Sequence, residues 1–214
     1  MIKAVIFDKD GVIVDSEPIQ FQAYQEVVAE YGGVFTLDDH KKICLGKGGI
    51  QPSLIVAVKY NIIDVEAFRQ KRRERYRKLS GEKLQMRAGA LRLIRELYKH
   101  YPLAVASGSS EKLLHHDLDK FKLNHYFKEI ISSQHLKSKP DPEIFLITAK
   151  KFGVEPKNCV VIEDTEFGLQ AAKSAGMYCI AVPHDISAHQ DFTKADLVVD
   201  SLEKINRNLI NNLK

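Results

Sequence analysis

The chain has 214 residues, of which 44% are hydrophobic and 28% are charged, a composition typical of a soluble globular protein with one large domain or a core and an insertion. Its formal net charge of +4 at pH 7 is mildly basic, which suits a small phosphorylated metabolite as well as it suits nucleic acid. Because no apolar segment approaches the roughly 18 residues of a membrane-spanning helix and the three cysteines form no C-x-x-C pair, we expect a cytoplasmic protein with free thiols.

Short apolar segments alternate with segments of helical spacing along most of the chain. Between the apolar segments, hydrophobic residues recur three or four positions apart, as at Leu91, Ile94 and Leu97, which predicts amphipathic helices. An alternation of this kind predicts crossover units, and hence an α/β fold with a doubly wound parallel sheet. The predicted strands comprise residues 3–8, 103–107, 129–132, 160–163, 178–182 and 197–199.

The alternation stops after the first predicted strand. Residues 16–87 show helical patterns and no convincing strand, with turns predicted at Gly32-Gly33 and around residues 46–49. We therefore predict a small all-α cap at residues 16–87, inserted into an α/β core of residues 1–15 and 88–214. We place the start of the return to the core at Ser80-Gly81. The predicted cap helices comprise residues 19–31, 37–44, 52–60 and 65–79.

Pairs of acidic residues end two of the predicted strands. Asp8 ends the first strand and Asp10 follows it, and Glu163 ends a later strand that Asp164 follows. Ligand sites of doubly wound sheets lie beyond the carboxyl ends of the strands, so these four side chains are expected to meet. Carboxylates about 4 Å apart repel by several kcal/mol at an effective dielectric of roughly 20, and a divalent cation relieves that repulsion. An all-oxygen ligand set favours Mg²⁺.

The ends of two other predicted segments carry groups that suit a phosphate. Ser107 offers a hydroxyl, and Gly108 lets the backbone approach a ligand closely ahead of a predicted helix N-terminus. Lys139 offers a positive charge beside two prolines that restrict the chain. A lysine, a hydroxyl, backbone amides and a metal ion together neutralise a phosphoryl group, which is the main demand of phosphoryl transfer.

Four motifs thus occur in a fixed order along the chain. They are Asp8-Lys9-Asp10-Gly11-Val12 with Asp15-Ser16 following, Ser107, Lys139-Pro140-Asp141-Pro142 and Glu163-Asp164-Thr165. In this order they resemble the motifs of the haloacid dehalogenase superfamily, in the branch that holds β-phosphoglucomutase and related sugar-phosphate phosphatases. The resemblance extends from residue 1 to about residue 183 and implies a Rossmann-like core with a helical cap after the first strand.

The resemblance implies a role for each residue of the site. Asp8 would be the nucleophile that forms an aspartyl-phosphate, and Asp10 would protonate the leaving oxygen and later deprotonate the attacking water or hydroxyl. Ser107 and the amide of Gly108 would bind phosphate oxygens, and Lys139 would pair with both Asp8 and the phosphoryl group. These roles imply a phosphatase of small-molecule phosphate monoesters.

The resemblance also implies the ligands of the metal. Mg²⁺ would be held by the carboxylates of Asp8 and Asp164 and the backbone carbonyl of Asp10, with Glu163 acting directly or through water. Asp10 argues against dehalogenases and phosphonate hydrolases of the superfamily, because neither reaction needs this acid/base on an ester leaving group.

The cap residues decide between a phosphatase and a phosphomutase. Gln20 stands where β-phosphoglucomutase has a histidine, and the loop with Lys47 lacks the arginine that clamps the distal phosphate there. A lysine does not reproduce the two-pronged hydrogen bonding of arginine, so we favour a phosphatase and keep the sugar phosphomutase as the alternative. Gln20 and Lys47 remain candidate substrate contacts from the cap.

Several charged residues outside the motifs have more ordinary interpretations. The basic run at residues 71–78 is predicted to be the solvated face of a helix rather than a nucleic-acid patch, although one or two of its arginines, such as Arg72, could face the pocket and bind an anionic substrate. We expect His115, His116 and Asp117 on a helix surface, and surface positions also for the loop histidines at 184 and 189.

Two hypotheses of other classes stay open. Receiver domains also accept phosphate on an aspartate, and a catalytically idle phosphate-binding module could keep the same residues. Singly, each motif could be an ordinary turn, helix cap or solvated lysine, and only their joint occurrence favours one site. We expect a monomer or weak dimer that acts on a small phosphorylated metabolite and binds neither nucleic acid nor a membrane.

Overall fold

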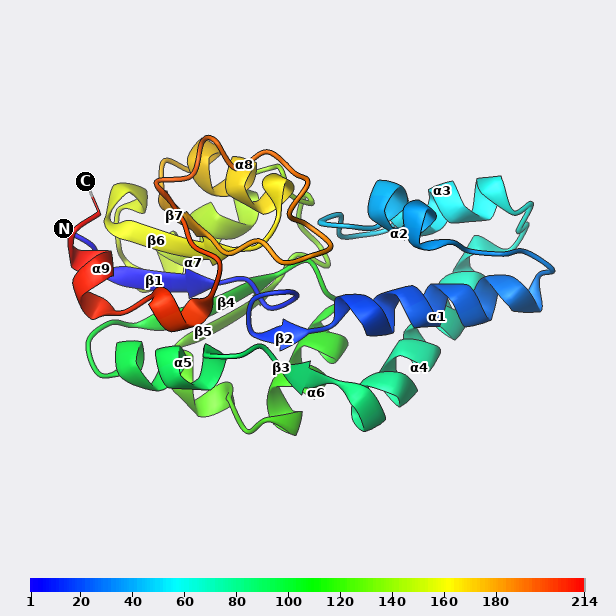
Figure 1. Cartoon of the computed structure of the whole chain (residues 1–214), viewed down its shortest axis with the longest axis horizontal. Coiled ribbons are helices and arrows are strands. Elements are labelled where there is room, and N and C mark those ends of the chain that lie inside the picture. Colours follow the sequence, from blue (N-terminus) through cyan, green and yellow to red (C-terminus); the bar gives the residue numbers. More distant parts are fainter. Residues whose placement is uncertain (214) are drawn as a thin grey trace.

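A six-stranded parallel sheet with the strand order β5-β4-β1-β6-β7-β8 forms the centre of the computed structural model, which describes residues 1–213. Some helices flank the sheet, and the helices of residues 17–83 extend away from it (Figure 1). The predicted doubly wound α/β fold is confirmed. The sheet strands are β1 (Ala4–Phe7), β4 (Leu103–Ser107), β5 (Glu129–Ser132), β6 (Cys159–Glu163), β7 (Tyr178–Ala181) and β8 (Leu197–Val198).

Both faces of the sheet are buried, which explains why its strands are almost uniformly apolar. Alternate residues of β1 serve the two faces: Val5 and Phe7 pack into one core, and Ala4 and Ile6 pack into the other. The first core includes residues of α5, α6 and α9, and the second includes residues of α7 and α8. These helices are α5 (Ala90–Tyr98), α6 (Glu111–Lys120), α7 (Glu143–Phe152), α8 (Glu166–Ser174) and α9 (Arg207–Asn211).

The strand order determines where a ligand can bind. β1 lies between β4 and β6, and the chain crosses to opposite sides of β1 to form these two strands. The carboxyl end of β1 is therefore the switch point of the sheet, where a crevice opens between diverging crossovers. Asp8 directly follows β1, so the sheet topology alone brings this residue to the crevice.

The helices between β2 and β3 pack around a core of their own. Tyr24, Val28, Phe35 and Phe68 are among its buried members. Figure 1 shows these helices side by side at the end of the molecule opposite the two chain termini. The helices are α1 (Glu17–Glu30), α2 (Leu37–Ile43), α3 (Gln51–Lys59) and α4 (Val65–Lys83). The division into a core at residues 1–15 and 88–214 and a cap at 16–87 stays a prediction.

Two local predictions were wrong. Helix α4 continues through Ser80-Gly81 to Lys83, because a glycine costs a helix only about 1 kcal/mol and the buried neighbours Tyr76 and Leu79 hold the helix in place. The chain then pairs β3 (Gln85–Met86) with β2 (Val14–Asp15) in a small antiparallel sheet. Strands of two residues leave no periodicity that a sequence pattern could show.

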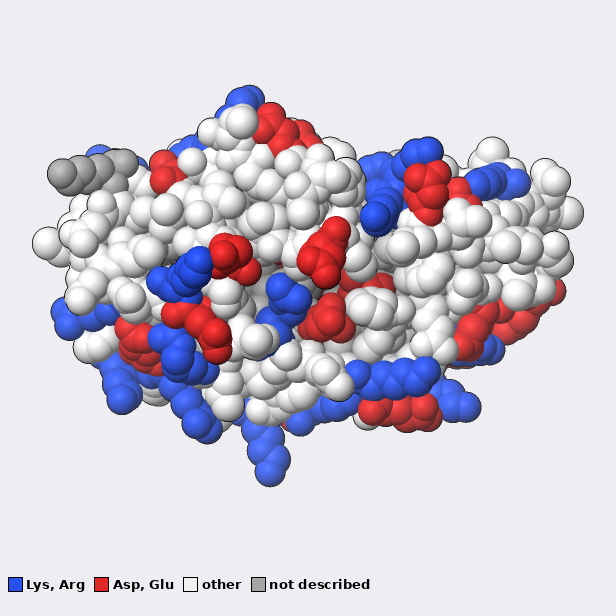
Figure 2. Space-filling model, viewed as in Figure 1, with Lys and Arg blue, Asp and Glu red and all other residues white. Residues whose placement is uncertain are grey.

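The predictions made from the composition concern free thiols, membrane-spanning helices and surface charge. Cys159 and Cys179 are buried free thiols, and Cys44 is a partly buried one. Within residues 1–213, no helix is both long and apolar enough to cross a bilayer. On the face drawn in Figure 2, lysine and arginine side chains are interspersed with aspartate and glutamate rather than gathered into one basic field.

Candidate active site

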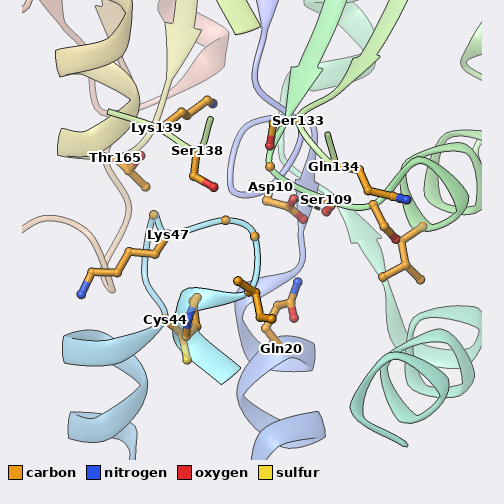
Figure 3. Close-up of a pocket in the computed structure, with 18 of the residues that line it drawn as sticks. Asp10, Gln20, Cys44, Lys47, Ser109, Ser133, Gln134, Ser138, Lys139 and Thr165 are labelled. Carbon is orange, nitrogen blue, oxygen red and sulfur yellow. Dashed lines mark hydrogen bonds between the residues drawn. The ribbon is translucent and has the colours of Figure 1, made fainter. Parts of the chain in front are cut away.

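A pocket of about 350 Å³ lies where the strand ends meet the helices of residues 16–87. Its lining comes from the strand ends and from the helices of residues 16–87. Figure 3 shows Asp10, Ser109 and Lys139 from the loops that follow the strands and Gln20 and Cys44 from the helices. The pocket therefore exists only while the helices cover the ends of the strands. A site with this construction can exclude bulk water from a reaction.

Lys139 lies between two carboxylates at the base of the pocket. Its Nζ donates hydrogen bonds of 2.5 Å to Asp8 Oδ1 and to Glu163 Oε1, and the lysine side chain is only 7% exposed. Burial lowers the pKa of Lys139, but Asp8 and Glu163 outweigh that effect and raise the pKa above its ordinary value. Glu163 Oε2 accepts hydrogen bonds from the amide and hydroxyl of Thr165, so the loop after β6 holds the carboxylate that positions the lysine.

Three carboxylates form a cluster that fits a divalent cation. Asp8, Glu163 and Asp164 each place one oxygen within 4.8 Å of the others. Burial, followed by the repulsion of neighbouring acids, raises the pKa of Asp164. Burial also raises the pKa of Asp8, and Lys139 offsets only part of the effect. Asp164 Oδ1 is buried and lacks a hydrogen-bond partner among the described residues. An oxygen-only set with these properties fits Mg²⁺.

Asp10 has a different environment from the other acids. Its carboxylate accepts hydrogen bonds from the hydroxyls of Ser16 (2.6 Å), Ser109 (2.9 Å) and Ser107 (3.3 Å), and it lies 2.8 Å from Lys9 Nζ. Burial raises the pKa of Asp10, but Lys9 and the hydrogen bonds outweigh burial and hold the pKa below its ordinary value. The side chain is thus engaged by hydroxyls and a lysine rather than by the acid cluster.

The two phosphate-binding residues predicted from the second motif, Ser107 and Gly108, lie in two different places. Gly108 and Ser109 line the pocket, whereas Ser107 is fully buried, donates to Asp10 and accepts the Ser109 amide. A Cβ atom at Gly48 would lie 3.2 Å from the Cα of Gly108, so the loop between α2 and α3 meets this loop backbone to backbone. Small residues on both sides permit the approach.

The two predicted cap contacts point in different directions. Gln20 lines the pocket, and its Oε1 accepts a hydrogen bond of 2.8 Å from Arg72 Nη1. Lys47 borders the pocket, but its Nζ donates to the carbonyl of Lys42 and lies 5.8 Å from the ring centre of Phe167. Figure 3 shows the Lys47 side chain directed away from Asp10. In this conformation Gln20 is the better placed of the two for a ligand.

The surface prediction for Asp117 was wrong. Asp117 is fully buried, and its Oδ2 accepts hydrogen bonds from Lys9 Nζ (2.5 Å) and from the hydroxyl of Tyr76 (2.8 Å). These two hydrogen bonds connect Asp117 of α6 with Lys9, which follows β1, and with Tyr76 of α4. The helical spacing could have predicted the burial of Asp117, because position 117 lies on the same helical face as Leu113 and Leu114.

The surface prediction was also wrong for His184, although His189 is exposed as expected. The His184 side chain is 7% exposed, and burial, followed by the charge of Arg87, lowers its pKa. Its Nδ1 accepts the Ile186 amide, so the neutral ring donates from Nε2 to Asp164 Oδ2 at 3.0 Å. His184 therefore orients a carboxylate of the acid cluster, a role that an irregular loop does not reveal in a sequence.

The solvated-face prediction for residues 71–78 was wrong for part of the run. Arg72 and Arg73 line the pocket together with Arg69, one turn earlier on α4. Lys71 and Arg75 instead contact Glu30 on α1. The orientation of α4 against α1 separates these two groups.

Replacing Gly168 with alanine should disturb the position of Glu163. Gly168 lies in α8, where a Cβ atom would be 1.7 Å from Glu163 Oε1. Displacement of this carboxylate removes a partner of Lys139, so we expect Gly168→Ala to lower the free energy of unfolding by about 1–3 kcal/mol in urea titrations.

Gly81 provides the matched control for this substitution. It also lies inside a helix, but a Cβ atom there would meet nothing within 4 Å. Gly81→Ala should be neutral or raise stability by up to about 1 kcal/mol. Equal effects of the two substitutions would contradict the steric role of Gly168.

Comparisons with known proteins agree with this geometry. A statistical model of the family described as haloacid dehalogenase-like hydrolase matches residues 5–182. The phosphorylated carbohydrates phosphatase of Thermotoga maritima is 33% identical over 203 residues, covering 92% of this chain and 93% of that protein. The β-phosphoglucomutase of Bacillus subtilis is 32% identical over 211 residues, covering 92% and 89%.

A solved structure supports the same relationship. The crystal structure of CbbY from Rhodobacter sphaeroides in complex with phosphate matches with a TM-score of 0.86 and 26% identity over 95% of this chain and 96% of that one. Sequence and structure therefore agree that the chain belongs to the haloacid dehalogenase-like hydrolase family.

Proposed function

We propose that the protein is a magnesium-dependent phosphatase that hydrolyses small phosphate monoesters of the sugar-phosphate type. The observation that carries the proposal is Lys139 between Asp8 and Glu163, with Asp164 closing an acid cluster at the switch point of the sheet. The names of the relatives support the substrate class, since they include a phosphorylated carbohydrates phosphatase and a fructose-1-phosphate phosphatase. We also propose that the protein works in the cytoplasm.

The first chemical step would use the Asp8 carboxylate. An oxygen of Asp8 attacks phosphorus while the bond from phosphorus to the ester oxygen breaks, and Asp10 protonates the departing oxygen. Lys139 stabilises the charge on the phosphoryl oxygens. The substrate-free environment lowers the pKa of Asp10, and an arriving phosphate dianion would raise it again, favouring the proton uptake that this step requires.

The second step would release the product. Asp10 removes a proton from water, the water oxygen attacks phosphorus, and the bond to Asp8 breaks to give inorganic phosphate. Mg²⁺ bound by the carboxylates of Asp8 and Asp164 and the carbonyl of Asp10, with Glu163 nearby, would withdraw negative charge from the phosphoryl group. The contact between Gly48 and Gly108 would keep bulk water from the first step.

The test is phosphate release from a panel of sugar phosphates, nucleotides and glycolytic phosphates. We expect turnover of sugar phosphates with Mg²⁺ and a loss of at least about 100-fold in EDTA that is reversed by added Mg²⁺, because the acid cluster repels an anionic substrate without a cation. Equal rates with and without metal would contradict the role of the cluster. No release across the panel would support an idle phosphate-binding module.

A sugar phosphomutase is the second candidate, and the β-phosphoglucomutase of Bacillus subtilis is the relative that favours it. The phosphatase is preferred because Gln20 and Lys47 replace residues expected of the mutase. Conversion of β-glucose 1-phosphate to glucose 6-phosphate should be measured with the bisphosphate present. Efficient isomerisation with little free phosphate would replace the phosphatase assignment.

A further inference from the structure

Three arginines of α4 face the pocket. Arg69, Arg72 and Arg73 are separated by the three- and four-residue intervals that place side chains on one face of a helix, and all three line the pocket that also contains Asp8. The fold brings this face over the strand ends. None of the three takes part in the chemistry proposed for Asp8 and Asp10.

On the side of the same helix that faces α1, two basic residues form ion pairs. Arg75 contacts Glu26 and donates to Glu30 Oε1 at 2.9 Å, and Lys71 donates to Glu30 Oε2 at 3.0 Å. These ion pairs fasten α4 to α1 and neutralise one another. The basic run of the sequence therefore contains residues that pair with α1 as well as residues directed toward the pocket.

Arg72 has no acidic partner among the described residues. Its Nη1 donates to the amide oxygen of Gln20, its guanidinium lies 4.9 Å from the ring centre of Tyr24, and its Nε is buried without a hydrogen-bond partner. Glu17 is the acid that residues 16–87 contribute to the pocket lining, and its Oε2 lies within hydrogen-bond distance, 2.6 Å, of His40 Nε2. Packing thus holds the guanidinium of Arg72 in place but leaves its charge unbalanced.

Glu66 is the single carboxylate paired with the other two arginines in residues 1–213. It lies 2.5 Å from Arg69 and 3.7 Å from Arg73, and it is 66% exposed, so solvent screens its charge. Burial and then the positive charge of Arg69 lower the pKa of Arg73, as expected for two guanidinium groups on one helical face. Three guanidinium groups and one carboxylate leave a net charge of about +2 at this end of the pocket.

We propose that Arg69, Arg72 and Arg73 form a second anion subsite, which binds a phosphate group of the substrate other than the one transferred to Asp8. A phosphate monoester carries a charge of about −1.5 to −2 at neutral pH, which balances the cluster better than a single carboxylate does. Guanidinium groups also bind phosphate through paired hydrogen bonds. The inference rests on the proposed phosphatase function and narrows its substrates to monosaccharide-sized bisphosphates.

The pocket dimensions agree with this substrate class. A volume of about 350 Å³ lies at the lower end of the range for small-molecule sites, which suits one sugar unit with its phosphates. One phosphate would lie against Lys139 and the other against α4, so the sugar would span the space between core and cap. Gln20, which already orients Arg72, would contact the sugar or its second phosphate.

The experiment compares fructose 1,6-bisphosphate with fructose 1-phosphate and fructose 6-phosphate, and glucose 1,6-bisphosphate with its two monophosphates. We expect kcat/KM of the wild type to favour the bisphosphates by roughly 10-fold or more, since each charged hydrogen bond to the second phosphate contributes to binding. Arg72→Ala should lower kcat/KM for bisphosphates by roughly 10- to 100-fold and for monophosphates by less than about 3-fold. Arg72→Lys should restore only part of the loss.

Arg75→Ala is the matched control, because it removes the same side chain from the same helix on the side facing α1. It should leave the preference for bisphosphates unchanged. Binding of both bisphosphates to Asp8→Asn protein, measured by calorimetry, separates the subsite from catalysis. If Arg72→Ala weakens this binding although the wild type releases no phosphate, the subsite stands and the phosphatase proposal fails. Turnover without a preference for bisphosphates, or equal losses for both substrate classes, would overturn the subsite.

Discussion

Asp8→Asn should lower kcat for magnesium-dependent phosphate release by at least about 10⁴-fold, the scale of loss seen when a covalent nucleophile is removed. The amide has nearly the shape of the carboxylate but cannot form the acyl phosphate. The measurement is initial-rate phosphate release from the best substrate of the panel. Rapid acid quench with labelled substrate should show label bound to the wild type and none bound to the variant.

The fold should survive this substitution. Burial raises the pKa of Asp8, so the ionised side chain is costly in the metal-free protein and a neutral amide removes that cost. Lys139 keeps Glu163 as a partner. Asp200→Asn, a change of the same kind at a 73% exposed position, should leave both rate and stability unchanged. Turnover of Asp8→Asn at the wild-type rate would falsify the nucleophile assignment.

Asp117→Asn should destabilise the protein by about 3–5 kcal/mol, because within residues 1–213 it leaves the fully buried Lys9 with Asp10 as its only remaining acidic partner. Tyr76 also loses the charged acceptor of its hydroxyl. The effect is large for a protein whose total stability is expected to lie between about 5 and 15 kcal/mol. Urea unfolding followed by circular dichroism gives the free energy of unfolding.

The double variant Lys9→Met/Asp117→Asn tests whether the cost comes from the charge of Lys9, which keeps Asp10 but has lost Asp117. Removing the lysine as well leaves no buried cation to neutralise, so the double variant should be more stable than Asp117→Asn alone. Lys9→Met alone completes the cycle. Strictly additive free energies would show that Lys9 and Asp117 do not depend on each other, despite the 2.5 Å between their charged atoms.

The four motifs could be placed from the sequence because parallel strands end at one edge of the sheet. Once the apolar segments before Asp8, Ser107 and Asp164 are predicted as strands, topology alone brings the residues that follow them together. The carboxylates meet for this reason, and Lys139 joins them from the loop between β5 and α7.

Contacts between the core and the helices of residues 16–87 had no such signal. Tyr76 of α4 meets Asp117 of α6 across 41 positions of chain, and the side of α4 that faces the pocket depends on how α4 packs on α1. Helical spacing shows that Arg69, Arg72 and Arg73 share a face, but not which surface this face meets. The loop conformation that brings His184 to Asp164 has no periodicity at all.

The close approach of Gly48 to Gly108 has a consequence for the rate at which the protein can work. With two backbones in contact above the strand ends, separation of the loops would widen the path by which a product leaves and the next substrate enters. Motions of this kind take microseconds to milliseconds, and they set an upper limit on turnover however fast the bond-breaking step becomes. The two short strands at the base of the helices, β2 and β3, are the connection about which such a separation would pivot.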